Sequence, residues 1–202
     1  TLSRSSAASD VYKRQVRDIE EGEILVKNLY LSFDPTQRGW LNDVPSYIPP
    51  VQIGEVMRAG SVGKVIESKN QNFSEDDIVQ GSFGWQEYAI SGEGSGFMPP
   101  QKLPEGISPT SALSIYGITG LTAYFGMLDI GKPEQNDTVL VSGAAGATGS
   151  VAGQIAKIKG ATNIIGIAGG PEKCKWVVEE AGFDSCIAVS YTHLTLPTIA
   201  IV

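Results

Sequence analysis

The sequence predicts an α/β protein in two parts, a β-rich first domain followed by a partial, doubly wound parallel sheet. Three observations support this prediction. Residues 20–90 hold short alternating runs of branched and aromatic residues, separated by Gly and Pro. From residue 138 onward, strand-like and helix-like segments alternate with short loops. The first strand-to-helix turn of that second part is rich in glycine.

The first half is expected to be a β-barrel or β-sandwich. Its predicted strands are Glu23–Ser32, Gly60–Ser68 and Asp77–Ser91, which alternate and are rich in β-branched and aromatic residues. Clusters of proline interrupt the pattern, as at Asp34-Pro35 and Pro49-Pro50. Several short strands at this spacing are typical of barrels and sandwiches.

The middle of the chain is expected to be helical. The first predicted helix covers residues 107–117 and opens on a Ser-Pro pair, and the second covers residues 118–131. Both end on glycine, which is a common helix stop.

The last part is expected to form a parallel sheet. Its segments are a strand Thr138–Gly143, a helix Ala147–Lys159, a strand Asn163–Gly169, a helix Pro171–Gly182 and a strand Phe183–Ala188. Strands that alternate with helices over short loops pair in parallel through right-handed crossovers.

The two ends of the chain differ from the rest in composition. Residues 1–15 show no sustained period, and residues 189–202 break the preceding alternation. We interpret both as adapter-like, non-native sequence that belongs to neither domain; a flexible tail at each end is the alternative. The remaining chain is divided into a β domain, residues 16–105, and a nucleotide-binding domain, residues 106–188.

Composition and charge disfavour several function classes. The 202-residue chain is 42% hydrophobic and 18% charged, with a net charge of −7, which suits a soluble globular protein and disfavours binding to nucleic acid or anionic membranes. Two uncharged stretches, residues 106–128 and 138–156, could span a bilayer by length, but their Gly, Ser and Thr content disfavours this. Cys174 and Cys186 are too few for a disulfide framework, which favours a reducing, cytoplasmic compartment.

The residues present in the chain disfavour several types of catalytic site. The only histidine, His193, lies in the excluded C-terminal segment. A catalytic zinc needs about three His, Cys or acidic ligands, and the β half offers no such set. Ser–His–acid and Cys–His nucleophiles lack a histidine. We therefore expect the chemistry to come from a cofactor and assign no catalytic residue.

The glycine-rich turn is a candidate phosphate cradle. Gly143, Gly146 and Gly149 form a G-x-x-G-x-x-G pattern between a predicted strand and helix, where a dinucleotide fingerprint must lie. Gly146 and the small Ala145 and Ala147 would let backbone N–H groups approach a pyrophosphate at the helix N-terminus. The alternative is that the small residues serve only close packing.

The end of the second predicted strand favours NADP over NAD. An acidic residue there would bind the ribose 2′-hydroxyl of NAD, but the sequence has Ala168–Gly170 instead. Lys173 follows within the next predicted helix and could bind a 2′-phosphate. The alternative is that Lys173 is a solvated helix charge, or pairs with Glu172 or Glu179.

These segments resemble the zinc-independent branch of the medium-chain dehydrogenase/reductase superfamily, the prostaglandin reductase and curcumin reductase type. The resemblance covers about residues 16–188. It rests on Asn28–Met57, Gly120–Gly131, Val139–Ala161 and Ile164–Asp184, of which the blocks beginning at Gly120 and Val139 are the most specific.

The resemblance implies a GroES-like β-barrel followed by a partial Rossmann domain, with NADP(H) bound between them. Carried over by position, Thr122 would lie near the nicotinamide, and Gly169 and Lys173 near the 2′-phosphate. The residues expected to line the pyrophosphate are Ala145, Gly146, Ala147, Thr148 and Gly149, next to Gly143.

The resemblance also implies candidate substrate contacts. Arg38 and Tyr47 lie in the segment that borders the family's substrate cleft. Their alternatives are a structural ion pair for Arg38, and packing beside Pro49-Pro50 for Tyr47.

The implied activity is NADPH-dependent reduction of the C=C bond of small α,β-unsaturated ketones or aldehydes. Quinone reduction and a non-catalytic NADPH-binding role remain alternatives, and an S-adenosylmethionine domain is disfavoured by the β domain ahead of it. The family has a strand before residue 16 and continues past Ala188, where further strands, a tyrosine thought to support the enolate and the homodimer surface lie. We therefore expect this chain to lack NADPH oxidation with an enone and to associate through an unpaired sheet edge.

Overall fold

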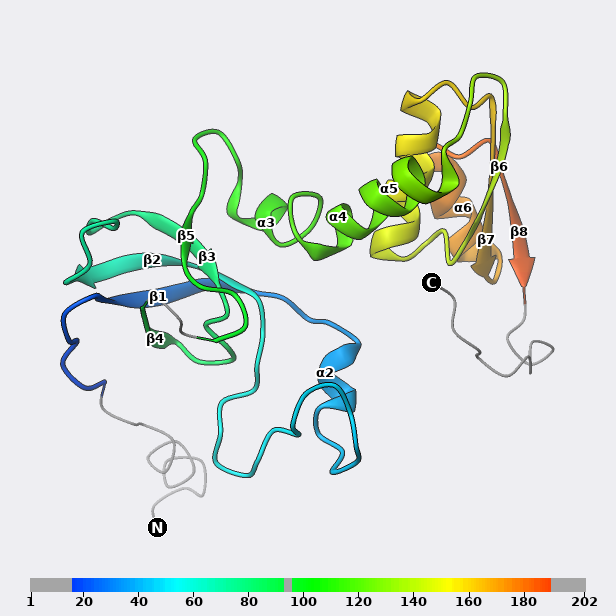
Figure 1. The fold of residues 1–202 in the computed structure, drawn as a ribbon. Helices are drawn as coiled ribbons and strands as arrows, with labels where there is room; N and C mark the ends of the chain where they lie inside the picture. Colours follow the sequence, from blue (N-terminus) through cyan, green and yellow to red (C-terminus); the bar gives the residue numbers. More distant parts are fainter. Residues whose placement is uncertain (1–15, 93–95, 190–202) are drawn as a thin grey trace, which may run out of the picture. The chain divides into compact units, whose positions relative to one another are not determined.

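The computed structural model describes residues 16–92 and 96–189 (Figure 1). The chain divides into two compact units, and the division lies after Leu113. The predicted domain limits, residues 16–105 and 106–188, stay a prediction. Within the described ranges, no helix is long and apolar enough to cross a membrane.

The first unit is built on a five-stranded antiparallel sheet in the order β4-β1-β2-β3-β5. Its strands are β1 (Glu23–Leu31), β2 (Ser61–Ser68), β3 (Ile78–Gly81), β4 (Tyr88–Gly92) and β5 (Gln101–Lys102). The predicted β-rich first half is confirmed. Because this strand order gives no closing pair among the described residues, the barrel remains a prediction.

Alternation places the core of the first unit on one face of the sheet. Ile24 and Val26 of β1 are fully buried, and the strand pairs with β2 on one side and β4 on the other. The buried cluster consists of Ile24, Val26, Val65, Val79, Phe83 and Ala89. The predicted strand Asp77–Ser91 is divided into β3 and β4, because Gly84 takes a left-handed conformation (φ +71°) in the turn between them.

The segment between β1 and β2 carries one short helix, α2 (Thr36–Gly39). Gln37 on this helix is 5% exposed, and its side chain accepts a hydrogen bond from the Asp34 amide (3.1 Å). It also donates to the carbonyl oxygens of Ser32 (3.0 Å) and Arg58 (3.3 Å). One buried amide thus fixes both ends of this long connection.

The predicted middle helices differ in extent from the structure. The first is a single turn, α3 (Pro109–Ala112), capped by the Ser108 side chain, which accepts from the Ser111 amide. The second is confirmed as α4 (Ile118–Phe125), which continues as a π-helical segment η1 (Gly126–Gly131). A Cβ at Gly120 would collide with the Ile115 carbonyl, so this glycine permits the close turn before α4.

The second unit confirms the predicted parallel sheet. In chain order its elements are β6 (Thr138–Ser142), α5 (Ala147–Ile158), β7 (Asn163–Gly169), α6 (Pro171–Glu179) and β8 (Ser185–Val189). The strands pair in parallel in the order β6-β7-β8. Helices α5 and α6 lie on the same face of this sheet (Figure 1), as expected when successive right-handed crossovers move in one direction.

The other face of the β6–β8 sheet is apolar and poorly covered by the described residues. Leu140 is in register with Ile165, and Ile167 with Ile187, so these side chains share one face. Leu140 is 58% exposed and Ile187 51% exposed. Parallel sheets ordinarily have both faces covered, so this sheet has an apolar surface without a covering layer here.

The two cysteines are joined in the second unit. A disulfide links Cys174 on α6 to Cys186 on β8, with the Cα atoms 5.2 Å apart. This bond is not predicted from the sequence, in which two cysteines are too few for a disulfide framework. Pairing depends on how α6 packs on β8, which the 12-residue separation alone does not reveal.

Candidate functional site

The turn after β6 has the geometry expected of a phosphate cradle. Gly143 is left-handed (φ +62°), and the Gly146 amide donates to the Gly143 carbonyl (2.8 Å), which closes the turn. Ala144 is fully buried, and its amide donates to the Ile167 carbonyl of β7 (3.0 Å). The turn is therefore tied to the neighbouring strand, which fixes where α5 begins.

The N-terminus of α5 presents its amide groups without a side-chain cap. The N-cap is Gly146, which is exposed and has no side chain to accept from the first turn. The first four N–H groups of a helix lack intrahelical acceptors and carry a partial positive charge. An anion such as a pyrophosphate fits this end of α5, where Ala147, Thr148 and Gly149 form the first turn.

Glycine packing accounts for other positions in the same block. A Cβ at Gly149 would collide with Gly143, and one at Gly153 would collide with the Phe183 ring. The packing interpretation therefore applies to part of the motif, and the phosphate cradle stays a prediction. Gly149 and Gly153 permit close packing, and Gly146 leaves the helix end open.

The end of β7 lies next to this turn and carries the predicted 2′-phosphate residues. Gly169 ends β7, and Gly170 (φ +92°) is the N-cap of α6, which starts with Pro171. Lys173 is exposed in the first turn of α6. Among the described residues no ion pair involves Lys173. The ion pair on this helix joins Lys175 and Glu179 (3.9 Å). Lys173 is thus available to an anionic ligand.

Thr122 is an exposed residue of α4. Its hydroxyl donates to the Ile118 carbonyl of the preceding turn (2.7 Å). The hydroxyl oxygen still has acceptor capacity, but its proton is used within the helix. The predicted location of Thr122 beside the nicotinamide stays a prediction.

Arg38 and Tyr47 lie in the segment that Gln37 anchors. Arg38 is exposed on α2, and no ion pair involves it among the described residues. Tyr47 is 77% exposed, and its hydroxyl oxygen accepts from the Trp40 indole N–H (3.1 Å). Its own hydroxyl proton can therefore be donated to a ligand. A role in binding substrate stays a prediction for both residues.

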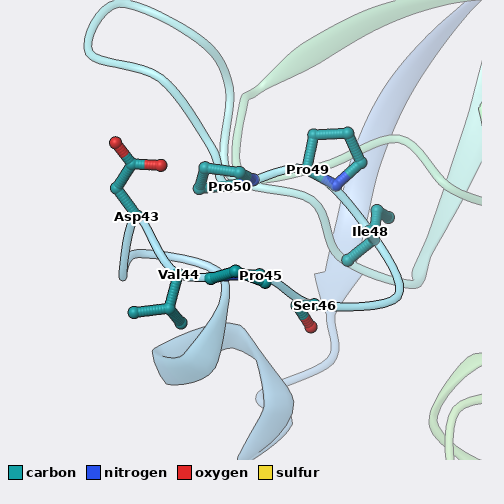
Figure 2. A pocket seen from close by; sticks show the side chains of 7 residues that line it. All are labelled: Asp43, Val44, Pro45, Ser46, Ile48, Pro49 and Pro50. Carbon is teal, nitrogen blue, oxygen red and sulfur yellow. The ribbon is translucent and has the colours of Figure 1, made fainter.

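A shallow hollow of about 390 Å³ lies in the same segment (Figure 2). The backbone around it is fixed where the Val51 amide donates to Trp40 (2.8 Å) and Arg58 donates to the Pro49 carbonyl (2.8 Å). Its lining consists of Asp43, Val44, Pro45, Ser46, Ile48, Pro49 and Pro50. Proline and these anchors give it a stiff wall, but it contains few polar groups able to orient a ligand.

The residues with shifted pKa values lie outside these candidate positions. The guanidinium of Arg17, followed by the Glu20 amide, lowers the pKa of Glu23 to about 2. The Ile164 amide, with a smaller contribution from Lys157, lowers the pKa of Asp184. In the described ranges no group of three His, Cys, Asp or Glu residues could hold a metal ion. In the part of the chain that the structure describes, the groups with shifted pKa values therefore do not coincide with the candidate site residues.

Two exposed aromatic residues were not among the predicted site residues. Phe33 is 78% exposed and Trp85 40% exposed, and their ring centroids lie 4.7 Å apart. They are 52 positions apart in the sequence, so no local periodicity could have revealed the pair. The only sequence signal is an aromatic residue beside a turn in each segment.

Comparisons with known proteins identify the type of each unit. Residues 5–99 match a family described as the N-terminal domain of oxidoreductase. NADPH-dependent curcumin reductase of Escherichia coli K12 is 44% identical over 167 residues, which are 83% of this chain and 47% of that protein. Prostaglandin reductase 1 of Bos taurus is 39% identical over 173 residues, which are 86% of this chain and 49% of that protein. The chain spans about half the length of the curated relatives that it matches.

A solved structure has a similar fold. CurA from Vibrio vulnificus in complex with NADPH is 44% identical and superposes with a TM-score of 0.75, covering 86% of this chain and 51% of that one. This likeness confirms the predicted fold class, a GroES-like domain followed by part of a Rossmann domain, with barrel closure left as a prediction.

Proposed function

We propose that this chain, which belongs to the medium-chain dehydrogenase/reductase superfamily and resembles its zinc-independent branch, provides half of an NADP(H)-dependent oxidoreductase. The observation that supports this proposal best is the uncapped N-terminus of α5, which follows a turn closed onto Gly143. Relatives named as NADPH-dependent reductases, and a relative solved with NADPH, support the same cofactor.

The chain's own residues would hold the two charged groups of NADP(H). The amides of Ala147 to Gly149 would bind the pyrophosphate, with the exposed Gly146 allowing close approach. Lys173 would pair with the 2′-phosphate beyond Gly169. The bound cofactor would supply a hydride, which no side chain of this chain can provide.

The proposed reaction is reduction of the C=C bond of an α,β-unsaturated ketone or aldehyde. Two relatives are named for a curcumin and a prostaglandin substrate, which favours an enone over a quinone. Hydride addition at the β-carbon gives an enolate with negative charge on the carbonyl oxygen, and this oxygen needs hydrogen-bond donors. The α-carbon then takes a proton from solvent or a hydroxyl, which completes the reduction. Arg38 and the free hydroxyl proton of Tyr47 are the donors that this chain would offer. A small-molecule substrate, a cytoplasmic location and a homodimer belong to the same proposal.

The cradle is tested by binding of NADPH to the 202-residue chain. Gly146→Leu is expected to raise the Kd at least about tenfold, because its side chain would occupy the space of the diphosphate. Gly126→Leu is the matched control, since a Cβ there meets nothing within 4 Å. Both variants are first melted to show that they fold, and Gly146→Ala gives a smaller perturbation. An unchanged Kd for NADPH in Gly146→Leu would contradict the proposal that the N-terminus of α5 binds the diphosphate.

Under this proposal, the 202-residue chain alone does not catalyse NADPH oxidation. Because the relatives are about twice as long as the matched region, we expect no NADPH oxidation when the 202-residue chain is mixed with an enone. A protein that joins this chain to a second half like that of its relatives is expected to consume NADPH with enones. Turnover with quinones alone would favour the quinone reductase alternative, and NADPH binding without any turnover would favour the non-catalytic one.

A further inference from the structure

The disulfide between Cys174 and Cys186 joins the first turn of α6 to strand β8. Cys174 is the fourth residue of α6, and its amide donates to the carbonyl of the N-cap residue Gly170 (3.2 Å). Cys186 lies on β8, at the edge of the described part of the sheet, next to β7. The bond therefore connects the start of a helix to an edge strand.

A glycine beside Cys186 lets α6 approach the sheet closely. Gly166 of β7 is in register with Cys186, and a Cβ added there would lie 2.8 Å from the Val177 Cγ1 of α6. Residues in register on neighbouring strands share a face, so Cys186 lies on the face that α6 covers. The Cα atoms of the two cysteines are 5.2 Å apart, a separation that a disulfide bridges without backbone movement. The fold therefore holds the two sulfurs where the bond can open and close in place.

The second half of α6 is anchored independently of the disulfide. Val177 is fully buried in the core cluster of the second unit, and its carbonyl accepts from the Phe183 amide (3.2 Å). The Trp176 carbonyl accepts from the Glu180 amide (2.9 Å). Opening the disulfide is therefore expected to release mainly the first turn of α6, which carries Lys173.

The two sulfurs differ in access to solvent. Cys174 is 9% exposed and belongs to the core cluster, whereas Cys186 is only partly buried against it. In thiol–disulfide exchange, access decides which sulfur is attacked, and the more stable thiolate leaves faster. The partial positive charge at the N-terminus of α6 favours a thiolate at Cys174. An incoming thiol is therefore expected to attack Cys186 and to release Cys174.

We propose that Cys174 and Cys186 form a reversible redox switch, opened by a small thiol such as glutathione, that sets the affinity of the Lys173 turn for the 2′-phosphate of NADP(H). The inference rests on the proposed cofactor site and adds its regulation. Disulfides in a reducing compartment, such as the proposed cytoplasmic location, are ordinarily transient or redox-sensing. In the closed state the first turn of α6 is held against β8, so Lys173 is presented on a fixed backbone.

The exchange balances as a two-electron reduction of the protein. The thiolate of one glutathione attacks the Cys186 Sγ and forms a mixed disulfide, and the bond to Cys174 breaks with its electron pair on the Cys174 Sγ. A second glutathione thiolate attacks the glutathione sulfur of the mixed disulfide and releases Cys186. Two glutathiones become one glutathione disulfide, and their two thiol protons end on the two cysteines. Glutathione disulfide drives the reverse reaction.

The test compares NADPH binding to the oxidised and the reduced 202-residue chain by isothermal titration. Reduction is expected to raise the Kd for NADPH about fivefold, because a released turn must be ordered again when Lys173 pairs with the phosphate. NADH lacks the 2′-phosphate and is the matched control ligand. Its Kd should change less than about twofold between the two states.

Three variants separate the disulfide from other effects of the reductant. Cys174→Ala/Cys186→Ala is expected to bind NADPH like the reduced chain, with or without reductant. Lys173→Ala should bind NADPH equally in both states, whereas Lys175→Ala on the same helix should keep the difference. Each form is melted first to show that it folds, and if the double variant does not fold, the reduced parent chain supplies the same comparison. Mass spectrometry of a reaction quenched during reduction should find glutathione on Cys186.

Several results would overturn the inference. These are a disulfide that stays closed in excess reduced glutathione, loss of cooperative melting on reduction, an equal Kd for NADPH in the two states, or a redox effect that Lys173→Ala retains. Glutathione trapped on Cys174 would contradict the order of attack. Absence of NADPH binding in both states would refute the cofactor proposal and the coupling to it, while reversible opening by glutathione would support the redox site by itself.

Discussion

The glycines of the turn after β6 meet different steric demands. Gly143 has a positive φ, which other L-residues rarely adopt, and Gly149 has no room for a Cβ. Gly146 has an ordinary φ of −85°, and a Cβ there would lie 3.1 Å from the Gly143 carbonyl oxygen, so a side chain at this position requires that oxygen to shift by a few tenths of an ångström. A substitution at Gly146 therefore reports on ligand access, whereas substitutions at the other two mainly report on folding.

Lys173 is expected to distinguish NADPH from NADH. Lys173→Ala should raise the Kd for NADPH about tenfold and leave the Kd for NADH nearly unchanged, because only NADPH carries the 2′-phosphate. Lys175→Ala on the same helix is the control, since Lys175 already pairs with Glu179. Isothermal titration with both nucleotides measures the difference. Equal losses for NADPH and NADH would contradict a contact with the 2′-phosphate, and unchanged affinity for both would assign Lys173 to the solvated surface of α6.

Glu23 is expected to titrate well below its usual range. Arg17 binds its carboxylate through two hydrogen bonds, of 2.8 and 2.7 Å, and this lowers its pKa from 4.5 to about 2. A lowered folded-state pKa means that the pair stabilises the fold above pH 4.5, and that this contribution disappears as the pH falls through about 2. Carboxyl NMR would give the midpoint directly. Arg17→Ala should return it towards 4.5, while Lys64→Ala, which breaks the pair with Asp76, should leave it in place.

At the scale of elements, local patterns predicted the second unit better than the first. The prediction from Thr138 onward agrees with the structure because the strands are short apolar runs, the helices alternate with them over short loops, and Gly or Pro lies at the boundaries. The predicted helix 107–117 was too long, since the chain must turn near Ile115 to let Gly120 approach it. The two-residue strand β5 depends on pairing with β3 and carries no period of its own.

Only the local part of the candidate site can be predicted from the sequence. The cradle is local, so the order strand, glycine turn, helix was enough to place Gly146 at the N-cap of α5. Phe33 and Trp85 come together only because Gln37 and Asn28 fix two distant turns. Contacts of this kind depend on tertiary structure, and a single sequence does not reveal them.

The disulfide between α6 and β8 is expected to stabilise the second unit. Closing a loop with a separation of 12 residues restricts the unfolded chain, which corresponds to about 3 kcal/mol. Urea denaturation with and without a reductant, followed by Trp176 fluorescence in a Trp40→Phe/Trp85→Phe background, measures this change. The double variant Cys174→Ala/Cys186→Ala should be insensitive to reductant. An identical midpoint for the oxidised and reduced chain would show that the bond contributes nothing to folding.

At the scale of the whole molecule, the sheet of the second unit leaves one apolar face exposed among the described residues. Residues 190–202 lie outside the described ranges, and the described part of the second unit has helices α5 and α6 on only one sheet face. Leu140 and Ile187 are more than half exposed on the other face. Strand β6 is also at the edge of the described sheet, with β7 on one side only. An apolar face and an open strand edge at the same place favour association between chains.

Leu140→Lys is therefore expected to reduce self-association of the 202-residue chain. A lysine on β6 would place charge on the apolar face and beside the open edge, which opposes pairing with a second copy. Ile158→Lys is the matched control, because Ile158 is 82% exposed at the end of α5, away from the edge strand. This substitution changes the charge and hydrophobicity in the same way as Leu140→Lys. Sedimentation velocity over a range of concentrations would show Leu140→Lys shifting towards monomer while Ile158→Lys follows the parent chain. If both variants shift equally, net charge controls association; if the parent is monomeric throughout, the open edge of β6 is no interface.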